Sequence, residues 1–308
     1  MKPVPFSTTS SASLTASRRL RTLLDAARAG RRTLIMGVLN VTPDSFSDGG
    51  RFFTPDAALL QAERMAAEGA DILDIGGEST RPATFTTGAP LDADEELRRI
   101  LPIVRALMER MPEIPISVDT YKASVARQAV EAGAAMINDI SALRADPEMA
   151  ATVAELGTPV CLMHLPGLPT ALPKKPVYAD VVLEVREHLR ERTEAALAAG
   201  IAPENIVLDP GIGFGKTVAH NLELLRRLRE LTTPLYPLLL GTSRKSTIGK
   251  VLGDLPPEDR LEGTAATVAL SIANGAAIVR VHDVKEMTRV ARMSDAIVRG
   301  WPPPGNEL

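Results

Sequence analysis

The sequence contains one cysteine, few aromatic residues and no long hydrophobic run. A single cysteine, Cys161, excludes an internal disulfide and suits a reducing compartment, so we expect a cytoplasmic protein. Aromatic residues make up 3% of the chain, too few for a stacking platform that binds single-stranded nucleic acid. The net charge of −3 gives no overall attraction to nucleic acid, and no apolar run approaches the roughly 20 residues of a membrane-spanning helix. We therefore expect small-molecule substrates, with no nucleic acid and no membrane as partners.

What is present indicates a large core, since 45% of the 308 residues are hydrophobic. From Thr33 onward, short apolar runs that end in polar residues alternate with helical patterns. The runs are continuously apolar, which is typical of parallel strands that are covered on both faces. The expected strands are Leu34–Asn40, Ile72–Gly76, Ile116–Thr120, Met136–Ile140, Val160–His164, Ile206–Pro210, Leu238–Thr242 and Ala277–His282.

Helical patterns separate these strands, and some carry end signals. Asp92 and Glu95 resemble a capping box, and Pro102 should kink the helix that follows or shift its boundary. The other expected helices are Pro55–Glu68, Lys122–Ala132, Tyr178–Ala199, His220–Leu231, Arg260–Asn274 and Lys285–Arg299. Strand–helix units in this number, over roughly 250 residues, predict an α/β fold, a single (β/α)8 TIM barrel. A doubly wound open sheet has the same local rhythm and is the alternative.

Both ends of the chain differ from this repeating part. Residues 1–32 are rich in Ser, Thr and Arg, and we expect an N-terminal extension whose short helix, Ser17–Ala29, caps one end of the fold. A transit peptide has a similar composition and is the alternative. The barrel should occupy residues 33–299 as the catalytic domain, and residues 300–308 should form a loose tail.

Polar residues stand at the carboxyl end of every expected strand, which is where the active site of a TIM barrel lies. These ends carry Asn40, Asp74, Asp119, Asn138 with Asp139, Met163 with His164, Asp209, Ser243 with Lys245, and Arg280 with His282. One polar end can arise by chance, whereas a polar end on each strand predicts a ring of polar groups around one mouth.

The residue types in this ring suit two kinds of ligand. Asp119, Asn138 and Asp209 favour a flat polar heterocycle, because a carboxylate can accept two neighbouring N–H groups such as those of a 2-amino-pyrimidinone. The basic residues Arg81, Lys245, Arg280 and His282 suit an anion such as a diphosphate, with Asn40 close to a Mg²⁺ ion. For each residue, a buried and internally satisfied ion pair is the structural alternative.

Several features that suggest other kinds of site do not match the required patterns. The run Gly211–Thr217 resembles a P-loop, but it has one residue too few between its first Gly and Gly-Lys-Thr. The histidines lack the spacing of a zinc site. Cys161 lies in an apolar strand and should be a core residue, and His188 is expected on the surface of its helix.

Five segments together resemble the dihydropteroate synthases of the folate pathway, and the resemblance covers Leu34 to about Arg299. They are Asn40–Gly50, Asp74–Pro82, Asp209–Lys216, Gly241–Ser246 and Arg280–Val284. The resemblance implies a transferase that condenses dihydropterin-hydroxymethyl diphosphate with 4-aminobenzoate. Since the arylamine is neutral at pH 7, we expect C–O cleavage to be the hard step and the displacement to be dissociative.

The resemblance also implies roles for individual residues. The pterin site would be Asp119, Asn138, Ile140, Met163, Asp209, Lys245 and Arg280, and the diphosphate site Asn40, Arg81, Arg280 and His282. The aminobenzoate site would be Phe46, Thr80, Arg81, Pro82, Phe214, Ser243 and Lys245. Arg81, Lys245, Arg280 and His282 would be catalytic, and Asn40 would bind Mg²⁺. A homodimer through late helices and closure of the loops Val41–Gly50 and Glu78–Thr87 are implied in the same way.

One segment departs from the family pattern. Ala83, Thr84 and Phe85 stand where the family usually has Gly-Ala, which leaves the shape of this loop and the sensitivity to sulfonamides open. Two other functions are compatible with much of the pattern: a pterin-dependent methyltransferase domain and a non-catalytic pterin-binding paralogue. The methyltransferase domains lack the Arg81 and Arg280–His282 elements, which favours the synthase.

Overall fold

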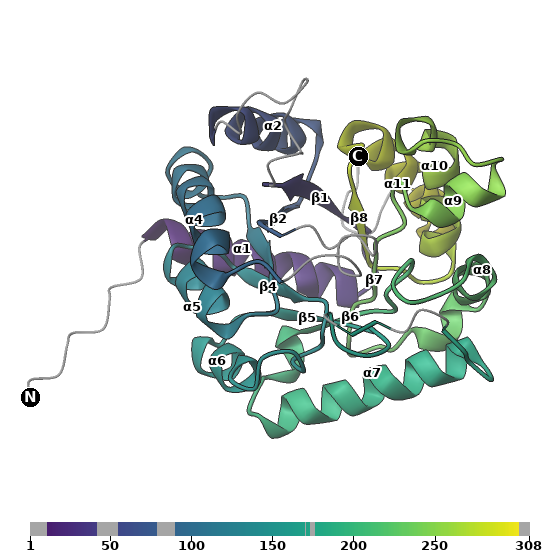
Figure 1. Cartoon of the computed structure of the whole chain (residues 1–308). Helices are drawn as coiled ribbons and strands as arrows, with labels where there is room; N and C mark the ends of the chain where they lie inside the picture. The colour runs from purple at the N-terminus through teal and green to yellow at the C-terminus, as the bar shows by residue number, and fades with distance from the viewer. Residues whose placement is uncertain (1–10, 42–54, 79–89, 170, 173–175, 302–308) are drawn as a thin grey trace, which may run out of the picture.

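Eight parallel strands form one sheet that closes into a barrel (Figure 1). The computed structural model describes residues 11–41, 55–78, 90–169, 171–172 and 176–301. The strands are β1 (Leu34–Asn40), β2 (Ile72–Gly76), β3 (Ile116–Asp119), β4 (Met136–Asp139), β5 (Val160–Met163), β6 (Ile206–Asp209), β7 (Leu239–Leu240) and β8 (Ile278–Val281). Their order is β6-β5-β4-β3-β2-β1-β8-β7, and a parallel bridge from Leu208 to Leu238 joins the two ends. The barrel is therefore confirmed, and the open sheet is excluded.

Helices follow the strands and cover the outside of the barrel (Figure 1). They are α1 (Ser11–Arg28), α2 (Pro55–Glu68), α4 (Ala93–Arg110), α5 (Ala123–Glu131), α6 (Met149–Leu156), α7 (Val181–Ala198), α8 (Val218–Arg226), α9 (Ser246–Val251), α10 (Leu261–Ala273) and α11 (Val284–Arg299). Short 3₁₀ turns lie at Pro203–Asn205, Leu228–Leu231 and Pro257–Asp259. Among the described residues, no helix is both long and apolar enough to cross a membrane.

Some helix boundaries differ from the sequence prediction. Asp92 is the N-cap of α4 and accepts the N–H of Asp94 at 2.9 Å, but the Glu95 carboxylate pairs with Arg98 and Arg99, so the expected capping box is only half formed. The helix runs past Pro102 without a break. The expected helix His220–Leu231 is divided into α8 and a 3₁₀ turn. The helices α6 and α9 were not predicted, because both are short and neither has a side-chain N-cap.

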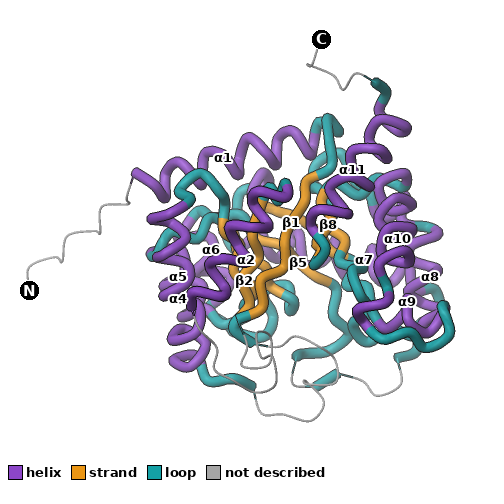
Figure 2. Tube along the Cα trace, turned by 90° about the horizontal axis from the view of Figure 1, so that it is seen from above, coloured by secondary structure: helices purple, strands orange, loops and turns teal. Residues whose placement is uncertain are grey.

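Helix α1 covers the amino-terminal end of the barrel. Leu20 and Leu24 on this helix are 0% and 1% exposed and belong to the main core. Arg28 donates to the carbonyl oxygen of Glu204 and Arg21 to that of Gly157 at 3.4 Å, and both carbonyls lie just before strands. The helix therefore packs at the end opposite to the carboxyl ends of the strands, which agrees with its place in Figure 2.

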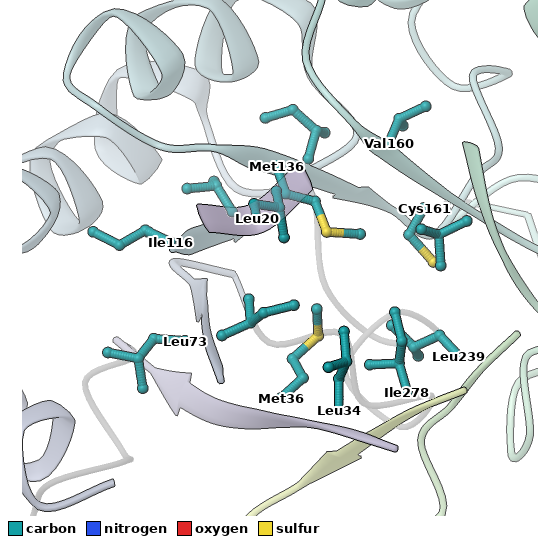
Figure 3. Packing of buried hydrophobic residues seen from close by; sticks show 14 of the residues in the cluster. Leu20, Leu34, Met36, Leu73, Ile116, Met136, Val160, Cys161, Leu239 and Ile278 are labelled. Atoms are coloured by element: carbon teal, nitrogen blue, oxygen red, sulfur yellow. The ribbon is translucent and has the colours of Figure 1, made fainter. Parts of the chain in front are cut away.

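Apolar side chains fill the barrel interior below its mouth. Met36, Met136 and Cys161 are fully buried and turn toward the space between the strands (Figure 3). The prediction that Cys161 is a core residue is confirmed. In the ladders, Met36 lies beside Arg280, and Asp119 lies beside Asn138. Successive inward-facing residues along a strand thus change from apolar to polar as the strand reaches the mouth.

Candidate active site

Four strand-end side chains form one hydrogen-bonded group inside the mouth. Arg280, on β8, donates from Nε to Asp74 Oδ2 at 2.6 Å and from Nη2 to Asp119 Oδ2 at 3.1 Å. Asn138, on β4, donates its side-chain amide to the same Asp74 oxygen at 3.1 Å. These residues come from four strands, so the structure brings together Asp119, Asn138 and Arg280, which were predicted for the pterin site. Asp74, to which the sequence assigned no role, holds Arg280 and Asn138 in place.

The carboxylates of this group are almost completely removed from solvent. Asp74 is 0% exposed and Asp119 is 5% exposed. Burial raises the pKa of Asp119, and the neighbouring Arg280 guanidinium opposes that shift. Oδ1 of each carboxylate has no hydrogen-bond partner within the described part of the chain. Because an unpaired buried acceptor costs about 1–3 kcal/mol, a ligand N–H group that reached either oxygen would be bound favourably.

Asp209, Phe214 and Lys245 form a second wall of the mouth. Asp209 accepts the N–H of Gly211 on Oδ1 at 2.7 Å, and burial raises the pKa of its carboxyl group. Lys245 Nζ lies 4.0 Å from the centroid of the Phe214 ring. Burial lowers the pKa of Lys245 to about 8, although the nearby Asp209 opposes that change. Gly213 permits this close packing, because its φ is +84° and a Cβ there would stand 2.9 Å from Lys245 Cδ.

An apolar cluster separate from the main core lies at the same strand ends. It contains Tyr121, Ile140, Met163, Leu165 and Phe214, all buried. Ile140 directly follows β4, the strand that carries Asn138. Met163 ends β5 and lies beside Asp209 in the ladder. The hydrogen-bonding residues therefore stand next to an apolar floor, which suits a flat ring with polar edges.

His282 is held as a neutral hydrogen-bond donor. Ser243 Oγ accepts the backbone N–H of His282 at 3.1 Å and lies 3.0 Å from its Nδ1. In the tautomer in which the Ser243 hydroxyl donates to Nδ1, the ring proton lies on Nε2. Burial, with Arg280 and Arg244 nearby, lowers the pKa of His282 to about 3, so the ring is uncharged at pH 7. Ser243, predicted for the aminobenzoate site, is 5% exposed and contacts His282.

Asn40 ends β1 opposite Gly76 in the ladder. A Cβ built on Gly76 would stand 3.9 Å from Asn40 Oδ1 and 3.6 Å from Asp119 Cβ, so the Asn40 amide lies at the same mouth as the carboxylates. In the described part of the chain, no cluster of at least three His, Cys, Asp or Glu residues is arranged to hold a metal ion. An amide oxygen is a ligand type that Mg²⁺ accepts, so Asn40 could contribute to a cation site at this mouth.

Four of the predicted site residues lie outside the described residues: Phe46, Thr80, Arg81 and Pro82. The altered segment from Ala83 to Phe85 lies outside them as well. Their assignments stay predictions.

An ion-pair network that the sequence did not reveal flanks the segment 79–89. Glu78 accepts hydrogen bonds from Lys122 Nζ at 2.6 Å, from Tyr121 Oη at 3.0 Å and from the backbone N–H of Leu91 at 3.0 Å. Lys122 also bonds Glu96, 1% exposed, at 2.5 Å. Glu78 thus links the residues on both sides of that segment, through contacts among the segments after β2 and β3 that no local motif encodes.

His188, which was expected on the surface of its helix rather than as a ligand, is half-buried. Its ring stacks edge-on against His164, with 4.8 Å between the ring centroids, and its Nε2 is buried without a hydrogen-bond partner among the described residues. Burial lowers the pKa of His188 to about 4. The side chain lies on the face of α7 that packs against β5, and the polar neighbours Glu187 and Arg190 concealed this orientation in the sequence.

A cavity of about 820 Å³ lies at the other end of the barrel and contains none of the predicted site residues. Its wall includes two acidic residues that are already paired: Asp71 with Arg32 at 2.7 Å, and Asp295 with Arg299 at 2.8 Å. The convergence of polar groups at the carboxyl ends of the strands, and not this cavity, therefore defines the candidate site.

Known proteins share this barrel and much of its sequence. The family described as pterin binding enzyme matches residues 36–282. The dihydropteroate synthase of Synechocystis sp. is 48% identical over 88% of this chain and 92% of its own length. That of Bacillus subtilis is 49% identical over 87% of this chain and 89% of its own.

Solved structures agree with these relatives. A dihydropteroate synthase from Clostridium difficile, crystallised in the presence of pteroic acid, has a TM-score of 0.80 and 49% identity and covers 88% of this chain and 98% of its own. The enzyme from Xanthomonas albilineans with 4-aminobenzoic acid has a TM-score of 0.80 and 46% identity, and covers 86% of this chain and 93% of its own.

Proposed function

The chain belongs to the dihydropteroate synthase family of pterin-binding enzymes, and from this premise we propose how its residues perform that transferase reaction. The substrates are (7,8-dihydropterin-6-yl)methyl diphosphate and 4-aminobenzoate, and the products are 7,8-dihydropteroate and diphosphate. The observation that carries the proposal is the convergence of buried acceptors, an apolar floor and basic groups at one mouth. Solved relatives contain 4-aminobenzoic acid and 7,8-dihydropteroate, which agrees with this substrate pair.

Asp119, Asn138 and Asp209 bind the polar edge of the pterin. The open oxygen of Asp119 accepts ring N–H groups, and the Asn138 amide reads a neighbouring position of the ring. Asp209 can use the oxygen that Gly211 does not occupy. Ile140 and Met163 pack against the face of the ring, since both belong to the apolar cluster beside these groups. Lys245 and Phe214 separate this pocket from the aminobenzoate and contact both substrates.

Arg280 and His282 stabilise the departing diphosphate. Arg280 has five N–H donors, and within the described part of the chain it uses two of them, on Asp74 and Asp119. The remaining donors can bind phosphate oxygens. His282 adds a neutral Nε2–H donor that Ser243 holds in the required tautomer. Arg81 is predicted to contribute a further cation. These groups act where negative charge increases as the C–O bond breaks, which is usually the largest catalytic contribution.

Mg²⁺ fits the chemistry of the residues that surround this position. Mg²⁺ prefers oxygen ligands, keeps several waters and is commonly shared between a protein oxygen and substrate phosphates. Asn40 Oδ1 supplies such an oxygen at the mouth, and we propose it as the protein ligand. When bound, the ion would neutralise charge on the diphosphate and strengthen it as a leaving group.

The bond-forming step needs little help from the protein. The arylamine of 4-aminobenzoate is neutral at pH 7 and needs no strong base, and the pterin ring can delocalise the positive charge left on its methylene carbon. We therefore propose a dissociative displacement, in which a closed site keeps water from the cation. A steep dependence of the chemical step on arylamine basicity would contradict this order of events.

We also propose a cytoplasmic homodimer. Helices α10 and α11 pack together and leave Leu270, Met293 and Ile297 at least 62% exposed, an apolar surface that a second copy would cover. The single buried cysteine is compatible with a reducing compartment. Sedimentation equilibrium of the wild type should give twice the mass of one chain, and Met293→Glu should give the mass of one chain. A monomeric wild type would contradict the dimer.

The experiment that tests the proposed reaction is diphosphate release with Mg²⁺, in the presence and absence of 4-aminobenzoate. Amine-dependent release together with dihydropteroate would support the synthase. Pterin binding without release would instead favour the non-catalytic paralogue. Sulfonamide inhibition in the same assay addresses the altered segment from Ala83 to Phe85, because the Yersinia pestis relative has been solved with a sulfonamide.

A further inference from the structure

The lysine of the glycine-rich run that resembles a P-loop forms hydrogen bonds within the protein. We define the glycine loop as Gly211–Lys216, which follows β6. In a P-loop, the lysine points at phosphate. Here Lys216 turns inward, and its Nζ lies 2.9 Å from the carbonyl oxygen of Gly211, 3.1 Å from that of Phe214 and 2.8 Å from His164 Nδ1.

The hydrogen bonds of this lysine are fully accounted for. Burial lowers the pKa of Lys216 to about 7, but the three acceptors close to its Nζ match the three N–H donors of the ammonium and favour the charged form. His164 is 4% exposed, and burial together with Lys216 lowers its pKa, so the ring is neutral. His164 Nδ1 therefore accepts from the ammonium, and the ring proton lies on Nε2.

The contacts of the glycine loop extend directly to the substrate-binding residues. Gly211 donates its N–H to Asp209 Oδ1 at 2.7 Å, while its carbonyl oxygen accepts from Lys216. Phe214 accepts from Lys216 through its backbone and supports Lys245 through its ring. Gly211 has a φ of +67°, and a Cβ there would stand 2.1 Å from the His164 carbonyl oxygen, so this strand end and the loop are in tight contact.

We propose that Lys216 is a positioning residue whose ammonium, seated on His164 Nδ1, holds the glycine loop in the shape that orients Asp209 toward the pterin and Phe214 toward the aminobenzoate. This inference rests on the proposed function for the identity of the ligands. Lys216 does not itself contact substrate. Its loss would release the Gly211 and Phe214 carbonyls together, so binding of both substrates would weaken.

The decisive test compares two replacements of His164. Asn places its side-chain oxygen where Nδ1 stands, whereas Gln places its oxygen near the position of Nε2. His164→Asn should keep both KM values within about threefold of wild type. His164→Gln and Lys216→Met should raise both KM values about tenfold or more, with kcat at saturation changed by less than threefold. The exposed, surface-paired Lys250 gives a matched control, and Lys250→Met should behave as wild type.

Each outcome is informative. Equal impairment of His164→Asn and His164→Gln would show that ring packing on His188, not the Nδ1 acceptor, matters, and would overturn the proposal. Normal kinetics of Lys216→Met would also overturn it. Nitrogen-15 NMR of His164 gives a readout independent of turnover: we expect an Nε2–H tautomer with unprotonated Nδ1, and an Nδ1–H tautomer would contradict the arrangement. If wild type shows this tautomer but no turnover, the proposed function fails while the arrangement of Lys216 stands.

Discussion

Replacing Arg280 should show how much the stability of the fold depends on the cation that pairs with the buried carboxylates at the mouth of the barrel. Its guanidinium bonds two carboxylates, Asp74 at 2.6 Å and Asp119 at 3.1 Å, that are at most 5% exposed. Arg280→Met keeps much of the aliphatic volume and leaves both carboxylates without their cation. Breaking a buried pair in this way costs about 3–5 kcal/mol of unfolding free energy, far more than the roughly 0–1 kcal/mol of an exposed pair.

The cost should depend on pH in a definite direction. Burial holds the pKa of Asp119 in the folded state above its value in the unfolded chain, and loss of the opposing guanidinium raises it further. Such a group stabilises the fold at low pH and loses that contribution as pH rises through the folded-state pKa. The pKa of Asp119 in wild type is already about 8, so the two proteins differ most in alkaline solution, where the wild-type carboxyl group is ionised and that of the variant is not. Because one pKa unit corresponds to about 1.4 kcal/mol, lowering the pH from 9.5 to 6.5 should recover about 2 kcal/mol of the deficit.

Urea unfolding of wild type and Arg280→Met at both pH values measures this difference. The control is Arg299→Met, because Arg299 has a similar exposure but pairs with Asp295, which keeps hydrogen bonds from the N–H and hydroxyl of Thr33. We expect a smaller and pH-independent loss for the control. A deficit for Arg280→Met that is equal at the two pH values would refute the electrostatic reasoning and point to lost packing.

Three further changes address other parts of the account. Leu24→Ala should cost about 2–5 kcal/mol in urea unfolding, because Leu24 is 1% exposed in the core, whereas Leu14→Ala, at a position 46% exposed, should be nearly neutral; equal effects would argue that α1 is not part of the core. His282→Gln should retain more kcat than His282→Ala. Both variants should keep the shape of the wild-type pH–rate profile near pH 6.5, since His282, with a pKa of about 3, is already neutral there. Lys122→Met should destabilise the fold more at pH 8 than at pH 6. The variant removes the cation that pairs with the buried Glu96, and this costs stability only where the Glu96 carboxyl group, whose pKa burial raises, is ionised. A difference in melting temperature between wild type and Lys122→Met that does not change with pH would contradict this.

The strands could be predicted from sequence because their signal is local. A buried parallel strand is a continuous apolar run, and β1 and β2 were predicted with their observed bounds. The prediction for β7 was too long, Leu238–Thr242 against Leu239–Leu240, because Leu238 makes only an isolated bridge to Leu208 and the ladder with β8 ends before Gly241 and Thr242. The helix α6 was missed because its eight residues have no side-chain cap.

The candidate site was predictable where a residue type at a strand end has a clear chemical preference. Asp119, Asn138 and Arg280 could be assigned to one mouth because barrel strands end together. The role of Asp74 could not, since it depends on the side chains of β2 and β8 meeting inside the barrel although β1 separates these strands in the sheet. The same holds for Lys216 and His164, whose contact depends on how the loop after β6 folds back over the end of β5.

The most direct test of the central claim is a titration of wild type and Asp209→Asn with the pterin diphosphate substrate, without 4-aminobenzoate. If the strand-end carboxylates hold the pterin, wild type should bind it and the variant should bind at least about thirtyfold more weakly, since a charged hydrogen-bonding partner contributes roughly 2 kcal/mol or more. The variant should also keep the wild-type unfolding free energy within about 1 kcal/mol, because Gly211 can still donate to the remaining amide oxygen. Equal pterin affinity in the two proteins would contradict the account.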